Sequence, residues 1–272
     1  MAENLQKVLF VNSEIFPYLP ESPISDIGRY LPQGIQERKK EIRSFMPRFG
    51  CINERKNQLH EVIRLSGINI VVGEVDRPLV IKVASISSAR LQVYFIDNED
   101  YFRRKAVYTD ADGNFFSDND ERAIFFAKGV LETVKKLRWA PDIIHCQGWI
   151  SHLVPAYLKL AYKDDPIFAG SKVVLSLYND SEGLSFAPDF AKKALTGSIS
   201  PSDLPISNSP DGIKLAETAV KYSDGIILGS PDIDPSLVKY CKRCKLPILQ
   251  YNEESYRDGS YIDGYNDLYD KL

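Results

Sequence analysis

Short apolar runs alternate with amphipathic stretches along most of this 272-residue chain. Several runs are rich in Val, Ile and Leu and too short for helices, so they predict buried strands. These runs are residues 7–14, 41–47, 143–144, 172–179, 225–230 and 247–251. Other stretches carry apolar residues at helical spacing, which predicts amphipathic helices. These are residues 26–38, 125–137, 153–160 and 213–222. The alternation predicts an α/β fold with a Rossmann-like, doubly wound and mostly parallel sheet.

Two segments depart from this alternation. Residues 59–96 contain β-rich runs with no helical stretch between them, which predicts an antiparallel hairpin insert that returns to the sheet at 91–96. Residues 252–272 predict a helical tail, in which Tyr261, Tyr265 and Tyr269 lie four apart and form one stripe that packs on the domain. We interpret residues 1–272 as a single domain that carries this insert and this tail.

The first loop is rich in proline. Pro17, Pro20 and Pro23 exclude a helix between residues 15 and 25 and stiffen the loop. The Ser25-Asp26 pair then offers an N-cap to the following helix. A strand, a loop and a helix in this order are the first unit of a doubly wound fold.

Polar residues interrupt the strand-to-helix stretch 142–160. His145, Cys146, Gly148 and Trp149 stand between its short strand and its helix. Open α/β sheets bind their ligands at the carboxyl ends of strands, so this turn is the first place to look for a site.

Composition and charge narrow the classes of protein. A net charge of -3 gives no reason to expect nucleic acid or an anionic membrane as a partner. No apolar run approaches the roughly 20 residues that span a bilayer. The start of the chain lacks the features of a secretory signal, so we expect a cytoplasmic protein.

Four cysteines stand at 51, 146, 241 and 244. The Cys241-x-x-Cys244 spacing suits a redox or metal site, but a zinc site needs about four ligands and no second pair lies nearby. We therefore expect reduced thiols and no metal site.

The stretch from His145 to Trp149, with the following run 153–158, resembles the His-Ala-His-Asp-Trp segment and helix of bacterial glycogen and starch synthases. These glucosyltransferases lengthen α-1,4-glucans from a nucleotide sugar. Three positions depart from the family pattern, where its second histidine, its aspartate and its active-site histidine are replaced: Gln147, Gly148 and Ile150.

Two further segments carry the same resemblance, which extends over about residues 7–231. Ser13, Glu14 and Asp26 match the residues on either side of the family's Lys-Thr-Gly-Gly loop. The loop itself is replaced, with other residues where the family has its lysine and its two glycines: Pro20, Ser22 and Pro23. Pro23 cannot donate a backbone N–H to a phosphate, so the phosphate cradle is not matched.

Asp118, Asn119 and Arg122 resemble the family's Asp-Asn-x-x-Arg motif, and Asn179 matches the asparagine of its His-Asn pair. An alternative reading makes Asp118 the N-cap of a helix, with Glu121 completing a capping box.

The resemblance implies the N-terminal, acceptor-side half of a GT-B type glycosyltransferase. It implies ADP-glucose or UDP-glucose as a donor substrate, no further cofactor, and α-glucan or maltooligosaccharide as a ligand. His145 is the candidate catalytic residue, because a histidine suits acid–base work, although a histidine that ends a buried strand also suits a structural role. The candidate sugar-binding or nucleotide-sugar-binding residues are Ser13, Glu14, Asp26, Asp118, Asn119, Arg122, Trp149 and Asn179.

Three hypotheses follow from these motifs and their departures. The chain is an impaired or inactive domain that serves as a glucan-binding or regulatory module. Alternatively, it is an active half that works in trans with a separate nucleotide-sugar-binding domain or as a homo-oligomer. The third hypothesis is a non-catalytic scaffold.

Overall fold

The computed structural model describes residues 5–207 and 209–272. In this part of the chain, ten strands form a sheet in the order β10-β9-β8-β7-β1-β2-β6-β5-β3, with β4 paired to β5. The strands are β1 (Lys7–Asn12), β2 (Glu41–Pro47), β3 (His60–Glu61), β4 (Ile68–Val72), β5 (Val75–Ile86), β6 (Leu91–Asp97), β7 (Ile143–Gln147), β8 (Lys172–Leu177), β9 (Gly225–Leu228) and β10 (Ile248–Leu249).

Seven neighbouring strands, from β10 to β6, run parallel. The chain builds outward from β1 through β2 to β6, then returns to the other side of β1 as β7. The order reverses there, so the carboxyl ends of β1 and β7 form the kind of crevice in which doubly wound folds bind ligands. The predicted α/β, Rossmann-like architecture is confirmed.

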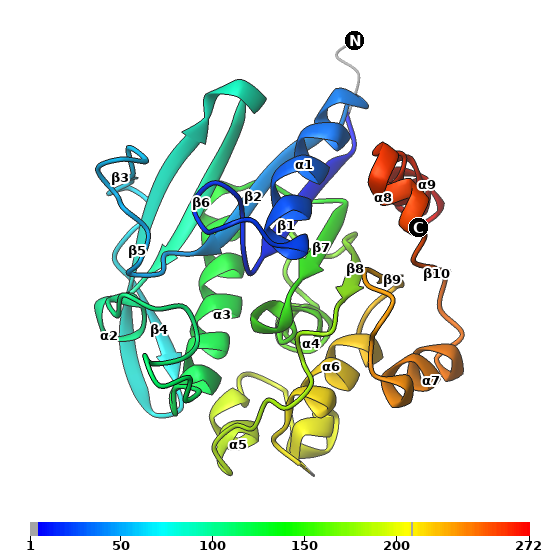
Figure 1. The fold of residues 1–272 in the computed structure, drawn as a ribbon. Coiled ribbons are helices and arrows are strands. Elements are labelled where there is room, and N and C mark those ends of the chain that lie inside the picture. The colour runs from blue at the N-terminus through cyan, green and yellow to red at the C-terminus, as the bar shows by residue number, and fades with distance from the viewer. Residues whose placement is uncertain (1–4, 208) are drawn as a thin grey trace.

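Helices cover both faces of the sheet (Figure 1). The helices α1 and α9 lie side by side on one face, whereas α3, α4 and α6 cover the other. The helices are α1 (Pro23–Glu37), α2 (Glu99–Phe102), α3 (Asn119–Leu137), α4 (Val154–Leu160), α5 (Phe190–Ala194), α6 (Gly212–Lys221), α7 (Pro235–Arg243), α8 (Glu253–Asp258) and α9 (Tyr261–Lys271). No helix in the described ranges is long and apolar enough to cross a membrane.

The two faces of the sheet belong to two hydrophobic cores, because successive side chains of a strand point to opposite sides. Ile144 and Cys146 of β7 lie in the larger core. Ile143 lies in the smaller core, with Phe10 of β1 and residues of α1 and α9. Tyr265 and Tyr269 of the predicted tyrosine stripe are almost fully buried there, so the stripe packs on the sheet as predicted.

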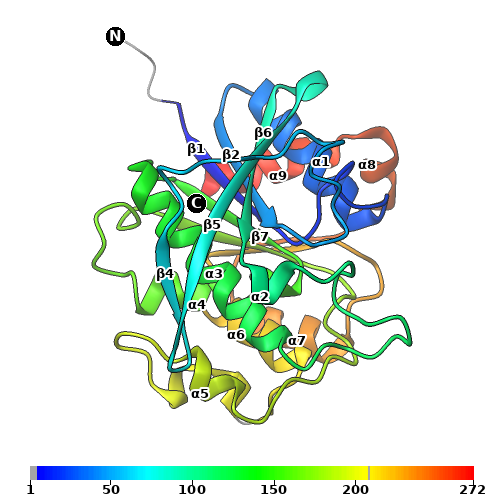
Figure 2. The ribbon, with the colours of Figure 1, turned by 90° about the vertical axis from the view of Figure 1, so that its left-hand side faces the viewer.

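The predicted insert is a set of antiparallel strands at one end of the sheet. The long strand β5 pairs with β6, β3 and β4, all antiparallel, while β6 runs parallel to β2 (Figure 2). β6 therefore joins the insert to the parallel sheet, as the pattern at 91–96 predicts.

The expected start of α1 is wrong, whereas α3 begins directly after Asp118, as the alternative reading has it, but without the capping box. Helix α1 begins at Pro23 and Ser22 is its N-cap, with Ser25 completing the capping box: the Ser25 N–H donates to Ser22 Oγ at 3.0 Å. Proline suits the first helical position, since the N–H it lacks would be unpaired there. At α3, the Asp118 side chain caps no backbone N–H and instead accepts hydrogen bonds from Arg104 at 2.9 and 2.6 Å.

Candidate functional site

The carboxyl ends of β1, β7 and β8 meet at one edge of the sheet. The Ser13 N–H donates to the Gln147 carbonyl at 2.9 Å, which joins the chain after β1 to the end of β7. Gly148 follows β7, and Asn179 and Asp180 follow β8. We call this set of residues the carboxyl edge.

Gly148 allows a close approach between two of these segments. Its φ is +81°, and a Cβ at this position would lie 2.0 Å from Ser13 Oγ and 3.5 Å from an oxygen of Asp180. Only glycine adopts such a conformation without strain and leaves room for the serine. The aspartate of the family pattern therefore does not fit this turn as it is built here.

Asp180 supplies a carboxylate at the same turn. Its Oδ2 accepts a hydrogen bond from the Trp149 backbone N–H at 2.7 Å. Burial raises the pKa of Asp180 to about 6, the hydrogen bond from Trp149 opposes this rise, and the charge of Glu14 adds to it. Sequence reasoning does not single out Asp180, because it follows the matched Asn179 and belongs to no motif; its place directly after a buried strand was the available signal.

Glu14 is the second carboxylate at the edge. Burial raises its pKa, and a hydrogen bond from Ser22 Oγ at 2.9 Å opposes the rise. Within the described ranges, neither Glu14 nor Asp180 forms an ion pair with a basic side chain. The edge therefore holds two carboxyl groups that bind protons more readily than usual.

Buried polar atoms at the strand ends lack partners. Asn12 Nδ2, Ser13 Oγ and Gln147 Oε1 make no hydrogen bond to any described residue. Leaving such groups unpaired costs about 1–3 kcal/mol each, so their clustering suggests a place where a polar ligand or water completes the bonding.

Trp149 lies beneath the edge. Its ring is 3% exposed and contacts Tyr108, Phe115 and Phe186, with ring centroids 4.7, 5.6 and 5.5 Å away. The ring therefore supports the turn, and only its backbone N–H takes part in the polar network of the edge.

The Asp118, Asn119 and Arg122 set reaches the carboxyl edge only through Tyr108, whose ring centroid lies 5.9 Å from the Arg122 guanidinium and 4.7 Å from that of Trp149. Asn119 and Arg122 are fully buried, and Arg122 donates to the Val107 carbonyl at 2.7 Å and to Asn119 Oδ1 at 2.5 Å. Four aromatic rings surround the guanidinium, and burial lowers the pKa of Arg122 to about 10. These residues hold the loop before α3 in place.

His145 points away from the edge, into the smaller core. It is fully buried, its Nε2 lies 2.7 Å from Ser176 Oγ, and its Nδ1 lies 2.8 Å from the Tyr269 hydroxyl. Burial lowers its pKa to about 3, so the ring is neutral. The geometry matches the structural role considered for this histidine.

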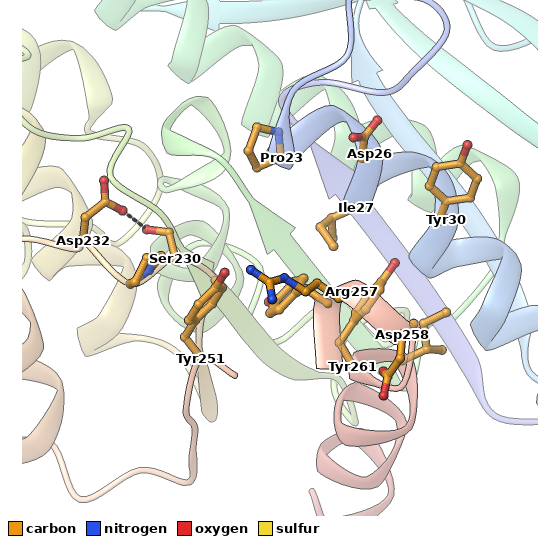
Figure 3. Close-up of a pocket in the computed structure, with 15 residues that line it drawn as sticks. Pro23, Asp26, Ile27, Tyr30, Ser230, Asp232, Tyr251, Arg257, Asp258 and Tyr261 are labelled. Atoms are coloured by element: carbon orange, nitrogen blue, oxygen red, sulfur yellow. Dashed lines mark hydrogen bonds between the residues drawn. The ribbon is translucent and has the colours of Figure 1, made fainter. Parts of the chain in front are cut away.

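Asp26 lines a second hollow beside the edge, and Asn179 contacts its lining. Asp26 lies in the first turn of α1 and lines a cleft of about 970 Å³ together with the loop after β9 and the chain from Tyr251 to Ile262 (Figure 3). Asn179 Nδ2 donates to Asp232 of this cleft at 3.3 Å. Burial and the charge of Glu21 raise the pKa of Asp26.

The N-terminus of α1 offers little to a phosphate. Pro23 has no N–H, the Ser25 N–H is taken by Ser22 Oγ, and the Asp26 N–H donates to the Ser22 carbonyl at 2.9 Å. A phosphate site at a helix start needs several free N–H groups, and this one has most of them occupied.

Comparison with known proteins agrees with this fold and these motifs. Residues 7–241 match the family described as starch synthase catalytic domain, and the chain belongs to that family. It is 42% identical over 180 residues to a glycogen synthase of Chlorobium luteolum, an alignment that covers 66% of this chain and 37% of that protein. It is 35% identical over 232 residues to a glycogen synthase of Chlorobaculum parvum, which covers 85% of this chain and 47% of that protein.

A solved structure shares the fold. The catalytic domain of starch synthase IV from Arabidopsis thaliana, bound to ADP and acarbose, superimposes with a TM-score of 0.69 at 16% identity. The match covers 92% of this chain and 52% of that one. The chain thus spans about half the length, or less, of these relatives.

Proposed function

We propose that this chain binds α-1,4-glucan at its carboxyl edge, as the acceptor-side part of a glycogen or starch synthase-type glucosyltransferase. The observation that carries the proposal is the cluster of unpaired buried polar atoms beside Glu14 and Asp180, in a chain of this family. Sugar hydroxyls both donate and accept hydrogen bonds, so they suit carboxylates and an unpaired serine hydroxyl together.

These residues offer few groups that would bind the nucleotide-sugar donor. Transfer from ADP-glucose or UDP-glucose requires cations or N–H groups that stabilise the leaving diphosphate. The two edge carboxylates carry no basic partner among the described residues, and Ile150, at the place of the family's active-site histidine, is fully buried. We therefore propose that residues 1–272 alone transfer little or no glucose and act as a glucan-binding module in the cytoplasm.

Calorimetric titration tests the proposal. Maltoheptaose, ADP-glucose and UDP-glucose are titrated separately into the purified chain, its Ser13→Ala and Asp180→Asn variants, and an Asp110→Asn control. Asp110 lies in an exposed loop, so its variant should bind like the parent. We expect maltoheptaose to bind and the two edge variants to weaken it. No binding of maltoheptaose overturns the proposal, and tight binding of a nucleotide sugar favours an active enzyme instead.

A second candidate is an active half that works in trans with a separate nucleotide-sugar-binding domain. Its test is the incorporation of labelled glucose from ADP-glucose into glycogen. The chain is assayed alone and mixed with the remaining half of the Chlorobaculum parvum synthase, with that half alone as the control. Activity that appears only in the mixture would support this candidate. If the mixture is also inactive, this candidate is rejected and the glucan-binding module remains.

A further inference from the structure

A hollow of about 970 Å³ lies between the start of α1, the loop after β9 and the segment that contains α8 (Figure 3). We call it the tail cleft. Its volume suits a ligand of several rings, since binding pockets for small molecules are typically about 300–1,000 Å³. The family match ends at residue 241, so the wall of the cleft formed by residues 251–262 lies outside the matched region.

Tyrosine rings form one wall of the tail cleft. Tyr251 and Tyr256 stack with centroids 5.0 Å apart, and Tyr256 and Tyr261 stack at 4.9 Å with planes only 6° apart. The Tyr256 hydroxyl lies 2.9 Å from that of the buried Tyr265, which fixes the middle ring. A wall that is already ordered loses little entropy when a ligand binds.

Tyr30 lines the cleft from α1, beside the Tyr261 end of this column of rings (Figure 3). Its side chain is 49% exposed. Exposed aromatic side chains around a hollow provide apolar faces and hydroxyl groups at the same time, so they suit ligands that have both kinds of surface.

The charges of the lining disfavour a phosphorylated ligand. Asp26, Asp232 and Asp258 face a single cation, Arg257, which itself forms an ion pair with Glu253. Diphosphates would be repelled by this excess of carboxylates. Neutral hydroxyl groups, in contrast, donate to carboxylates, and Ser230 already donates to Asp232 in this way at 2.7 Å.

We propose that the tail cleft is a second binding site for a neutral oligosaccharide, a segment of α-glucan that stacks on its tyrosines. The proposal rests on the proposed function for the identity of the sugar, but it uses different residues from the carboxyl edge. Asn179, which donates to Asp232, links the two sites. A glucan held at both would be bound more tightly than at either alone.

Hydrogen exchange with mass spectrometry tests the proposal on the whole chain, with and without maltoheptaose and, separately, ADP. We expect maltoheptaose to slow hydrogen exchange in residues 251–262. Tyr30→Ala and Tyr251→Ala should each raise the Kd for maltoheptaose about five- to tenfold. Tyr30→Phe keeps the ring and should keep most of the affinity. Ile63→Ala removes an exposed apolar side chain in the insert and serves as the control.

The outcomes separate the two sites. Protection only at 147–150 and 178–181, with both tyrosine variants binding like the parent, overturns the tail-cleft proposal and leaves the edge proposal intact. Protection only at 251–262, with Asp180→Asn unchanged in affinity, overturns the edge proposal and leaves the tail-cleft proposal intact. Binding of ADP that is lost in Arg257→Gln would make the cleft a nucleotide site and overturn the oligosaccharide assignment.

Discussion

The Tyr269 hydroxyl lies 2.8 Å from Nδ1 of His145, although 124 residues separate the two side chains in the chain. His145 Nε2 is bonded in turn to Ser176 Oγ of the neighbouring strand. This buried polar chain connects α9, β7 and β8, so it fixes the position of the terminal helix on the central part of the sheet.

Tyr269→Phe should destabilise the chain by about 1–3 kcal/mol, because a buried histidine nitrogen loses its partner. Urea unfolding followed by circular dichroism measures the change. Tyr261→Phe is the control: Tyr261 belongs to the same helix, and its hydroxyl makes no hydrogen bond to the described residues. Equal midpoints for the two variants would contradict the importance of the Tyr269–His145 bond.

Gly148→Ala should destabilise the chain more than Gly113→Ala. Both glycines have a positive φ, +81° and +84°, so both substitutions introduce backbone strain of about 1–3 kcal/mol. Only the Cβ at 148 meets Ser13 Oγ, at 2.0 Å, whereas nothing lies within 4 Å of the Cβ at 113. The clash should add about 1–3 kcal/mol, measured as the difference between the two urea midpoints. If Gly148→Ala loses no more stability than Gly113→Ala, the turn at Gly148 relaxes to accommodate the added Cβ.

Asp180 should make stability depend on pH. Its folded pKa of about 6 lies above the roughly 3.9 of an unfolded aspartate, so ionising it costs the folded state free energy. The stability that protonated Asp180 contributes is fully present below about pH 4 and is lost as the pH rises through 6. Relative to Asp180→Asn, the parent should therefore lose about 2–3 kcal/mol between pH 4 and pH 7.

Two variants check the origin of this dependence. Glu14→Gln removes a negative charge that raises the Asp180 pKa, so the loss should end at lower pH and be smaller in total. Asp110→Asn should behave in the opposite sense, because hydrogen bonds from Asn114 lower the pKa of Asp110 and the parent gains stability as the pH rises. A pH-independent difference between parent and Asp180→Asn would refute the assignment.

Arg122→Met should loosen the loop at residues 103–117. The substitution removes the hydrogen bonds to Val107 and Asn119 and leaves both acceptors short of a donor, at a cost of about 1–3 kcal/mol. Limited proteolysis should then cut this loop faster. Arg104→Met removes a partly exposed ion pair with Asp118 and should cost less than about 1 kcal/mol. If both variants are cut at the rate of the parent, Arg122 does not hold the loop.

Much of the fold follows from local patterns. Strand β2 has the bounds that its apolar run predicts, Glu41–Pro47, and the change of pattern at 59–96 is the antiparallel insert. Helical spacing likewise predicts the buried stripe of Tyr265 and Tyr269. Periodicity suffices for these features, because burial of one face fixes both the type of element and its orientation.

The membership of the site was decided by tertiary structure. The sequence by itself determined which residue types stand at the strand ends, and it pointed to Ser13, Glu14 and Asn179. Only the assembled sheet brought Asp180 to the backbone of Trp149, turned His145 toward Tyr269, and placed Arg122 among aromatic rings. Each of these contacts joins elements that are separate in the sequence. The distance and orientation between such elements depend on how the whole core packs, and local sequence patterns carry no information about either.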